Sequence, residues 1–160
     1  MKPGIHIFIL SLYCFTPAFA DQGADNDAAV IVPAGSVTVE QPWIRAGDKE
    51  AIMLPAYAVF RSNANLPWVL ERVTARGFAM VMIHRIVLQD GEPRMALQDT
   101  LSIPPGETIT MNRDGLHLMF MGPKKHYKDG DRIQVAFHFR DQKPLTMMVP
   151  VLQSAPPTSK

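Results

Sequence analysis

Hydrophobic and polar residues alternate along most of the chain between Val37 and Val151, with frequent interruptions by turn-forming residues. A period of two is typical of β-strands that bury one face. Fourteen prolines and the lack of any long segment with helical periodicity argue against a helical domain. The predicted strands are Val37–Glu40, Ala56–Arg61, Val69–Thr74, Met80–Leu88, Arg94–Gln98, Thr108–Met111, Leu116–Met121, Ile133–Phe139 and Leu145–Val151.

Turn-forming sequences separate these strands. Asp90-Gly91 and Asp129-Gly130 are strong hairpin signals, and Pro104-Pro105-Gly106 and Asp114-Gly115 break the chain elsewhere. Many short strands at regular spacing, without an internal repeat, favour an all-β fold with two packed sheets. We therefore predict a single-domain, two-sheet β-sandwich.

The first twenty residues have the features of a secretory signal peptide. Lys2 is positive, Ile5 to Phe15 is apolar, and Ala18-Phe19-Ala20 is a small-x-small cleavage site. The apolar run is short for a membrane span, and an uncleaved anchor is the less favoured alternative. We predict a signal peptide over residues 1–20, a flexible leader over 21–35, a β-sandwich domain over 36–152 and a disordered tail over 153–160. The mature protein is expected in the periplasm, without membrane insertion after signal cleavage.

Cys14 is the single cysteine of the chain. A lipoprotein is the alternative it raises, but Tyr13 places a bulky ring where a small residue is expected before a lipidated cysteine. Cleavage of the signal would leave no disulfide, no thiolate ligand and no cysteine nucleophile. It would also leave 15 basic against 15 acidic residues. This balance gives no reason to predict nucleic acid or anionic lipid as a partner.

Methionine is unusually frequent, and nine of the ten methionines follow the predicted signal. Met usually fills gaps in protein cores, so its position relative to histidine decides between packing and metal binding. In the strand Leu116–Met121, alternation places His117, Met119 and Met121 on one face. The opposite face is an ordinary core stripe. The first face is a row of potential metal ligands.

A second pair of donors lies on the predicted hairpin around Asp90-Gly91. His84 belongs to its first strand, and the second strand returns through Met95, which brings a sulfur towards the imidazole. Imidazole and neutral thioether donors favour Cu(I) over Zn(II). Four such ligands need no water or carboxylate, which is typical of a closed site rather than a catalytic one. The predicted Cu(I) ligands are His84, Met95, His117 and Met119, spaced His-x10-Met-x21-His-x-Met.

Each of these residues alone has an ordinary structural explanation, since a single histidine on a strand is usually a surface or core residue. The four together, in an exported chain without cysteine, favour the metal site. Met121 is expected only to shield the site from water. Met80 and Met82 are left open between core packing and an auxiliary copper-docking path.

With these residues in view, the chain resembles the PCu(A)C (PCuAC) family of periplasmic copper chaperones, from about Val37 to Val151. The ligand spacing equals the family's signature. The other family-like segments are Gln41-Pro42-Trp43-Ile44-Arg45-Ala46, Asp90-Gly91, Ile103-Pro104-Pro105-Gly106, Gly115-Leu116-His117-Leu118-Met119-Phe120-Met121-Gly122, Lys128-Asp129-Gly130-Asp131 and Val149-Pro150-Val151.

The resemblance implies a cupredoxin-like β-sandwich that binds Cu(I) through His84, Met95, His117 and Met119. It also implies delivery of copper to the copper centre of cytochrome c oxidase, often alongside a Sco-type thiol protein. Two features depart from the family pattern. Arg85 follows the first ligand histidine, where its charge is expected to disfavour copper or to shape a docking rim. The tail lacks a His/Met-rich extension for a second, Cu(II) site.

Other functions remain alternatives at this point. A periplasmic copper-buffering or resistance protein without an oxidase client would share the same ligands. A copper oxidase or monooxygenase would need an open coordination position and usually several imidazoles, so we predict that the protein is not an enzyme. A blue-copper electron carrier would need a cysteine ligand. A plain adhesive sandwich with methionine in its core would bind no copper.

Overall fold

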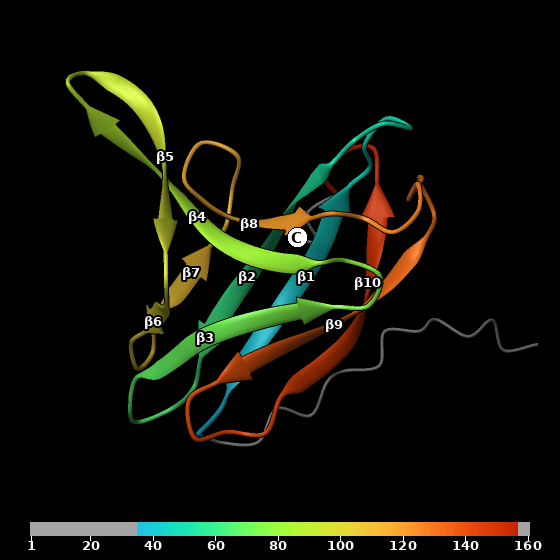
Figure 1. The fold of residues 1–160 in the computed structure, drawn as a ribbon. Helices are drawn as coiled ribbons and strands as arrows, with labels where there is room; N and C mark the ends of the chain where they lie inside the picture. The colour runs from blue at the N-terminus through green and yellow to red at the C-terminus, as the bar shows by residue number, and fades with distance from the viewer. Residues whose placement is uncertain (1–34, 157–160) are drawn as a thin grey trace, which may run out of the picture. The chain divides into compact units, whose positions relative to one another are not determined.

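Ten β-strands and no helix make up residues 35–156, the part of the chain that this computed structural model describes (Figure 1). The predicted signal peptide, the leader up to residue 34 and the last four residues of the predicted tail lie outside that range. The strands are β1 (Val37–Arg45), β2 (Met53–Ser62), β3 (Trp68–Ala75), β4 (Met80–Gln89), β5 (Glu92–Gln98), β6 (Leu101–Ile103), β7 (Thr108–Thr110), β8 (Leu116–Met121), β9 (Arg132–Phe139) and β10 (Leu145–Leu152).

Nine of these strands confirm the strands predicted from alternation. β6 was not predicted, because three residues are too few to show a period. β1 is longer than predicted. Its pairing with β2 shifts between Glu40 and Trp43, and Gln41 there has a φ of 46°, so a bulge interrupts the alternation without ending the strand.

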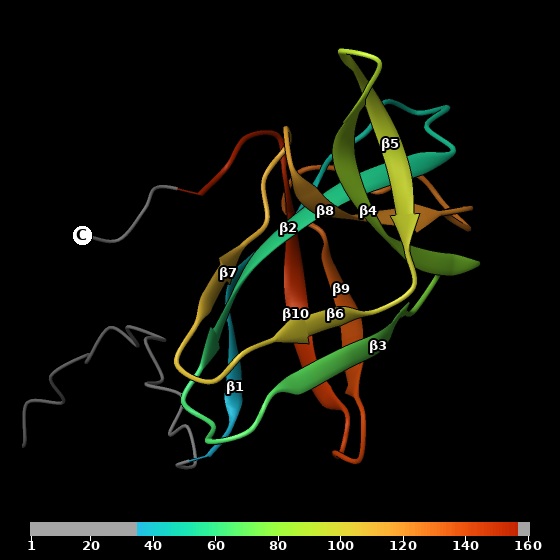
Figure 2. The same ribbon diagram turned by 90° about the vertical axis from the view of Figure 1, so that its left-hand side faces the viewer.

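The strands form a two-layer sandwich whose layers are joined by hydrogen bonds. The order along the sheet is β5-β4-β8-β2-β1-β10-β9-β3-β6, and β7 pairs with the far end of β2. The parallel pair β1–β10 makes one junction between the layers, and a β3–β4 pairing of Val73 with Val81 makes another. Figure 2 shows β9 and β10 running side by side, with β4, β5 and β8 grouped away from them. The predicted all-β, two-sheet sandwich is confirmed.

The core lies between the two layers and follows from alternation. On β9, Ile133, Val135, Phe137 and Phe139 are buried while the residues between them are more exposed. Phe60 of β2 meets Phe137 edge to face, with ring centroids 5.8 Å apart, and this contact joins the layers. Each fully buried side chain of this size contributes about 1.5–3 kcal/mol relative to an exposed one.

The two predicted hairpin turns have different outcomes. Asp90-Gly91 connects β4 to β5 as predicted, with Gln89 opposite Glu92 and φ values of 54° and 80° at the turn. Positive φ at both central residues is typical of a two-residue hairpin turn. The hairpin prediction for Asp129-Gly130 is wrong. This turn precedes β9, whose partners are β10 and β3, and Lys128 N donates to Asp131 Oδ2 across it. Within residues 35–156 there is no helix long and apolar enough to cross a membrane.

Candidate metal centre

β8 lies between β2 and β4, and the register of these strands decides which side chains share a face. Across β4 and β8, His84 lies opposite His117, Met82 opposite Met119, and Met80 opposite Met121. Directly opposed residues point to the same side of a sheet. We call this side the ligand face. Its members on β2, β8, β4 and β5 include Met53, Pro55, Tyr57, His117, Met119, Met121, Met80, Met82, His84, Ile86, Leu88, Pro93, Met95 and Leu97.

The two predicted imidazole ligands lie next to each other on this face. The ring centroids of His84 and His117 are 5.9 Å apart, and the rings are nearly perpendicular. Nδ1 of His117 lies 3.2 Å from the carbonyl oxygen of Gly115. A carbonyl oxygen only accepts, so in this bond Nδ1 carries the hydrogen and the lone pair is on Nε2. A backbone carbonyl that sets the tautomer in this way is a common support of metal-binding histidines.

His84 carries the unusual polar atom of the site. Its Nδ1 is buried and has no hydrogen-bond partner within the described structure. A buried polar atom without a partner is costly, and such atoms often belong to functional sites. Burial, and secondarily the nearby His117, lower the pKa of His84 below its usual value. A lowered pKa keeps the imidazole neutral, which is the form that binds a metal.

The two predicted thioether ligands lie at different depths. Met119 follows His117 by two positions on β8 and is only 6 % exposed. Met95 lies opposite Ile86, so it is the diagonal neighbour of His84 on the ligand face, and it is 54 % exposed. All four predicted ligands thus lie on one face. His84, His117 and Met119 occupy two adjacent rows of the β4–β8 register, and Met95 lies one row further out on the hairpin.

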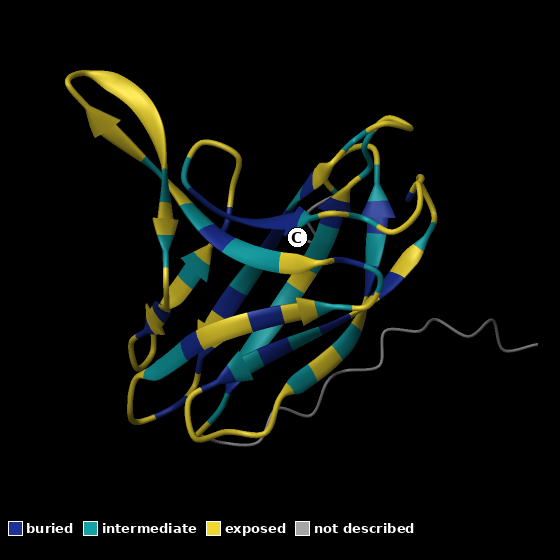
Figure 3. Cartoon of the chain, in the orientation of Figure 1, coloured by how far each residue is buried: buried dark blue, intermediate teal, exposed yellow. Residues whose placement is uncertain are grey.

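The site is more buried than an exposed metal-transfer site would be. β8 is buried on both faces, and the exposed fraction of His117 is only 3 %. Figure 3 shows β8 in dark blue along most of its length, whereas the outer half of the β4–β5 hairpin is yellow and projects away from the rest of the sheet. Tyr57, on the same face of β2, is buried, and its ring packs at a tilt of 37° against Trp43 of β1, with ring centroids 4.9 Å apart. Because Trp43 lies directly opposite Tyr57, the two rings form an aromatic pair on the ligand-face side of β1 and β2.

Two further residues change the sequence-based description. Arg85 is on the opposite face of β4, where its Nε donates to Gln98 Oε1 at 3.0 Å, so its charge does not point onto the ligand face. Met53 was outside the strand predicted for this part of the chain, yet it lies on β2 directly opposite Met121. Met53-Leu54-Pro55-Ala56 contains no polar residue, so alternation gave no signal there, and Pro55 argued against a strand.

Known proteins with similar sequences match most of the β-sandwich domain. The family described as "Putative lipoprotein LpqE-like" matches residues 37–151. The chain is also 25 % identical over 119 residues to "Putative lipoprotein Lxx21020" of Leifsonia xyli subsp. xyli (strain CTCB07), covering 74 % of this chain and 70 % of that protein.

Solved structures with the same fold include PCuAC domains. The copper-bound PCuAC domain from PmoF2 matches with a TM-score of 0.64 and 21 % identity, over 77 % of this chain and 97 % of that one. The apo PCuAC domain from PmoF1 gives 0.62 and 23 %, over 78 % and 98 %. The solution structure of CuI-DR1885 from Deinococcus radiodurans gives 0.60 and 22 %, over 81 % and 85 %. The described residues therefore have the cupredoxin-like fold of PCuAC domains.

Proposed function

This chain belongs to the LpqE-like family, and from that premise we propose that it is an exported metallochaperone for Cu(I). The proposed ligands are His84, Met95, His117 and Met119. The observation that carries the proposal is the adjacent pair of imidazoles on β4 and β8, in which the buried Nδ1 of His84 has no partner. Two similar folds are named as copper-bound, one of them as the Cu(I) form, which supports copper as the cargo.

The donor chemistry favours Cu(I) over other metals. The lowered pKa of His84 favours its neutral imidazole, and thioethers Met82 and Met119 form the next pair along the register from the two histidines. Neutral soft sulfur with neutral imidazole is a poor set for hard cations and a good one for Cu(I). The ion would thus be held without a negatively charged ligand, so that a thiolate on a partner can compete for it.

Release of the ion would begin at Met95. His84, His117 and Met119 are on paired strands of the sheet interior, whereas Met95 is exposed on the outer hairpin. An incoming thiolate or imidazole can replace the Met95 sulfur first while the other three donors keep the ion. Softer thiolate ligands then set the direction of transfer. The recipient we propose is the copper centre of cytochrome c oxidase, reached directly or through a Sco-type thiol protein.

Export to the periplasm is part of the proposal. The names of the family and of the Leifsonia protein both describe lipoproteins, which are exported proteins. Cleavage after Ala20 and lipidation at Cys14 predict different mature N-termini. Mass spectrometry of the exported protein distinguishes them: our prediction is an unmodified chain beginning at Asp21, and a lipidated Cys14 would contradict it.

Copper binding is tested by anaerobic competition of the purified protein with a Cu(I) chelator. We expect one tightly bound Cu(I) at the proposed ligands, severe weakening in His84→Gln, and unchanged affinity in His126→Gln. His126 is an exposed histidine whose Nδ1 lies 3.2 Å from the carbonyl of Asp48. Equal affinity in His84→Gln and the unmodified protein would contradict the site.

The client is tested separately in cells. A strain lacking the protein should lose cytochrome c oxidase activity under copper limitation and recover it when copper is added. The alternative, a copper-buffering or resistance protein without an oxidase client, predicts normal oxidase activity and sensitivity to excess copper.

A further inference from the structure

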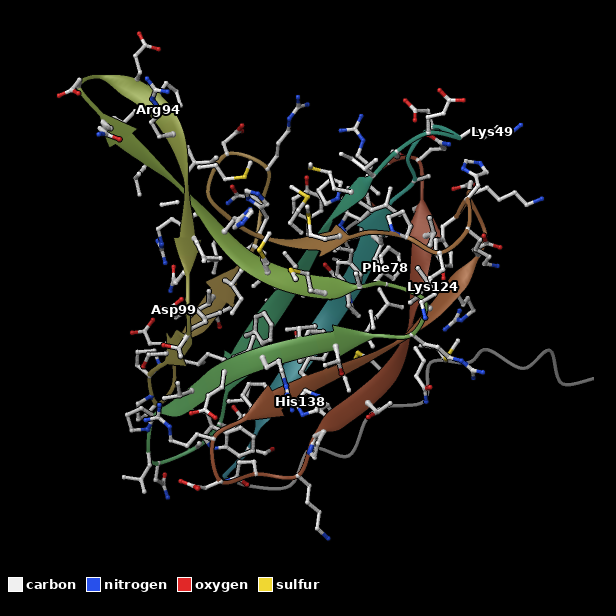
Figure 4. All side chains as sticks on the ribbon, viewed as in Figure 1. Lys49, Phe78, Arg94, Asp99, Lys124 and His138 are labelled. Atoms are coloured by element: carbon white, nitrogen blue, oxygen red, sulfur yellow. The ribbon has the colours of Figure 1, made fainter. Side chains whose placement is uncertain are left out.

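Three methionines form a row across the ligand face, two rows away from the histidine pair. Met121 of β8 lies directly opposite Met53 of β2 on one side and Met80 of β4 on the other. Opposed residues on neighbouring strands have Cβ atoms about 4.5–5.5 Å apart, so three thioethers project from the same side within reach of one another. Figure 4 shows sulfur atoms, in yellow, gathered beside β4 and β8.

Core packing does not explain this row. Gap-filling methionines are normally buried, but Met53 is 40 % and Met80 56 % exposed, and Met121 is half-buried. Large apolar side chains that lie together at a surface usually mark a binding site. Between this row and the histidines lie Met82 and Met119, which are also paired, so thioether donors continue from the surface to the imidazoles.

The backbone holds the row in register. On either side of Met121, Ala79 N donates to the Met121 carbonyl at 2.9 Å, and Gly122 N donates to the Ile52 carbonyl at 2.9 Å. These bonds tie β8 to the strand starts of both β4 and β2 at the level of the three methionines. The three sulfurs therefore come from a rigid platform rather than from a loop, which favours a defined site.

We propose that Met53, Met80 and Met121 form a second Cu(I) site, made of thioethers alone and distinct from the site at His84 and His117. Thioether sulfur is a neutral soft donor and selects a soft monovalent ion such as Cu(I) or Ag(I) over divalent cations. Three such donors hold the ion more weakly than a set with two imidazoles, so this site fills second. It goes beyond the chaperone function and does not depend on it.

The number of bound ions tests the site. Ag(I) is titrated into the purified mature protein, and Met methyl signals are followed by NMR. The unmodified protein should bind two ions, the second with shifts of the Met53, Met80 and Met121 methyls. The triple variant M53L/M80L/M121L should bind one ion. The single variant Met80→Leu should weaken the second ion by about ten-fold or more, the lower end of what loss of a supporting group costs at metal sites. Met148→Leu is the matched control, because Met148 is 47 % exposed on β10.

The double variant H84Q/H117Q separates this proposal from the chaperone site. If both sites exist, it keeps one ion, with shifts in the three methionine methyls. If only the thioether site exists, the unmodified protein binds one ion that survives in H84Q/H117Q and is lost in M53L/M80L/M121L. Binding of a single ion that H84Q/H117Q abolishes, or two ions in the triple methionine variant, would overturn the second site. Leu replaces Met with little change of volume, so folding should survive and circular dichroism checks it.

Discussion

Replacing Met119 separates its role as a ligand from its role in packing. The side chain is 6 % exposed, so Met119→Ala would remove a buried side chain and cost about 2–5 kcal/mol of unfolding free energy. Met119→Leu nearly conserves volume and should cost less than about 1.5 kcal/mol. Leu cannot coordinate copper, however. We therefore expect Met119→Leu to remain folded and to bind Cu(I) at least about ten- to hundred-fold more weakly, a loss seen even for supporting groups around metal sites.

Two measurements on the same samples decide this prediction. Urea unfolding of the apo protein gives the packing cost, and anaerobic chelator competition gives the Cu(I) affinity. Leu118→Met, its neighbour on the opposite face, is a matched control because it changes volume little and faces the core. It should leave Cu(I) affinity unchanged. If Met119→Leu binds Cu(I) as tightly as the unmodified protein, Met119 is not a ligand. If its loss of Cu(I) affinity is no larger than its loss of stability explains, the ligand role cannot be separated from the packing role.

Three further predictions follow from the structure. Met95→Leu should change the free energy of unfolding by no more than about 0.5 kcal/mol, because Met95 is exposed. It should nevertheless speed the transfer of Cu(I) to a chelator in stopped-flow experiments. An unchanged transfer rate would contradict the role of Met95 as the exchangeable ligand. Gly77→Ala should destabilise the domain by more than about 1 kcal/mol in urea unfolding, because Gly77 has a φ of 88° and a Cβ there would collide with the Tyr127 hydroxyl. An unchanged midpoint of the urea transition would contradict this prediction. Burial lowers the pKa of His84 and His138 in the folded protein. Below about pH 6.5 the unfolded apo protein therefore binds more protons than the folded one, so the free energy of unfolding should decrease as the pH falls. A free energy of unfolding that stays constant between pH 7 and pH 5 would contradict this prediction.

The alternation of hydrophobic and polar residues was enough to predict most strands, because most strands have one face that is more buried than the other. It missed β6, which is too short to show a period, and it did not reveal whether the second face of a strand is also buried. β8 is buried on both sides, so its pattern located the strand but did not show that His117 and Met119 are covered. That burial comes from side chains on other strands, and the position of those strands depends on a register that alternation along β8 does not contain.

The same limit explains which part of the metal site could be derived from the residues alone. The two-residue turn at Asp90-Gly91 sets the β4–β5 pairing, so Met95 must lie opposite Ile86 and on the face of His84. A slip of this pairing by one residue would move Met95 to the other face. In the same way, one residue between His117 and Met119 puts both on one face of β8.

No local rule joins these two halves of the site. Three strands, β5, β6 and β7, lie in sequence between β4 and β8, so the turn chemistry that sets the β4–β5 pairing says nothing about how β4 meets β8. In the sequence, that meeting was predicted from the donor types of the four residues in an exported chain without cysteine, and from the family resemblance, not from any rule of strand pairing. In the structure it rests on β4–β8 backbone pairing that places His84 opposite His117. A slip of this pairing by one residue would turn His84 away from His117 and expose the buried stripe around Ile83, so the core that stabilises the fold also keeps the two imidazoles together.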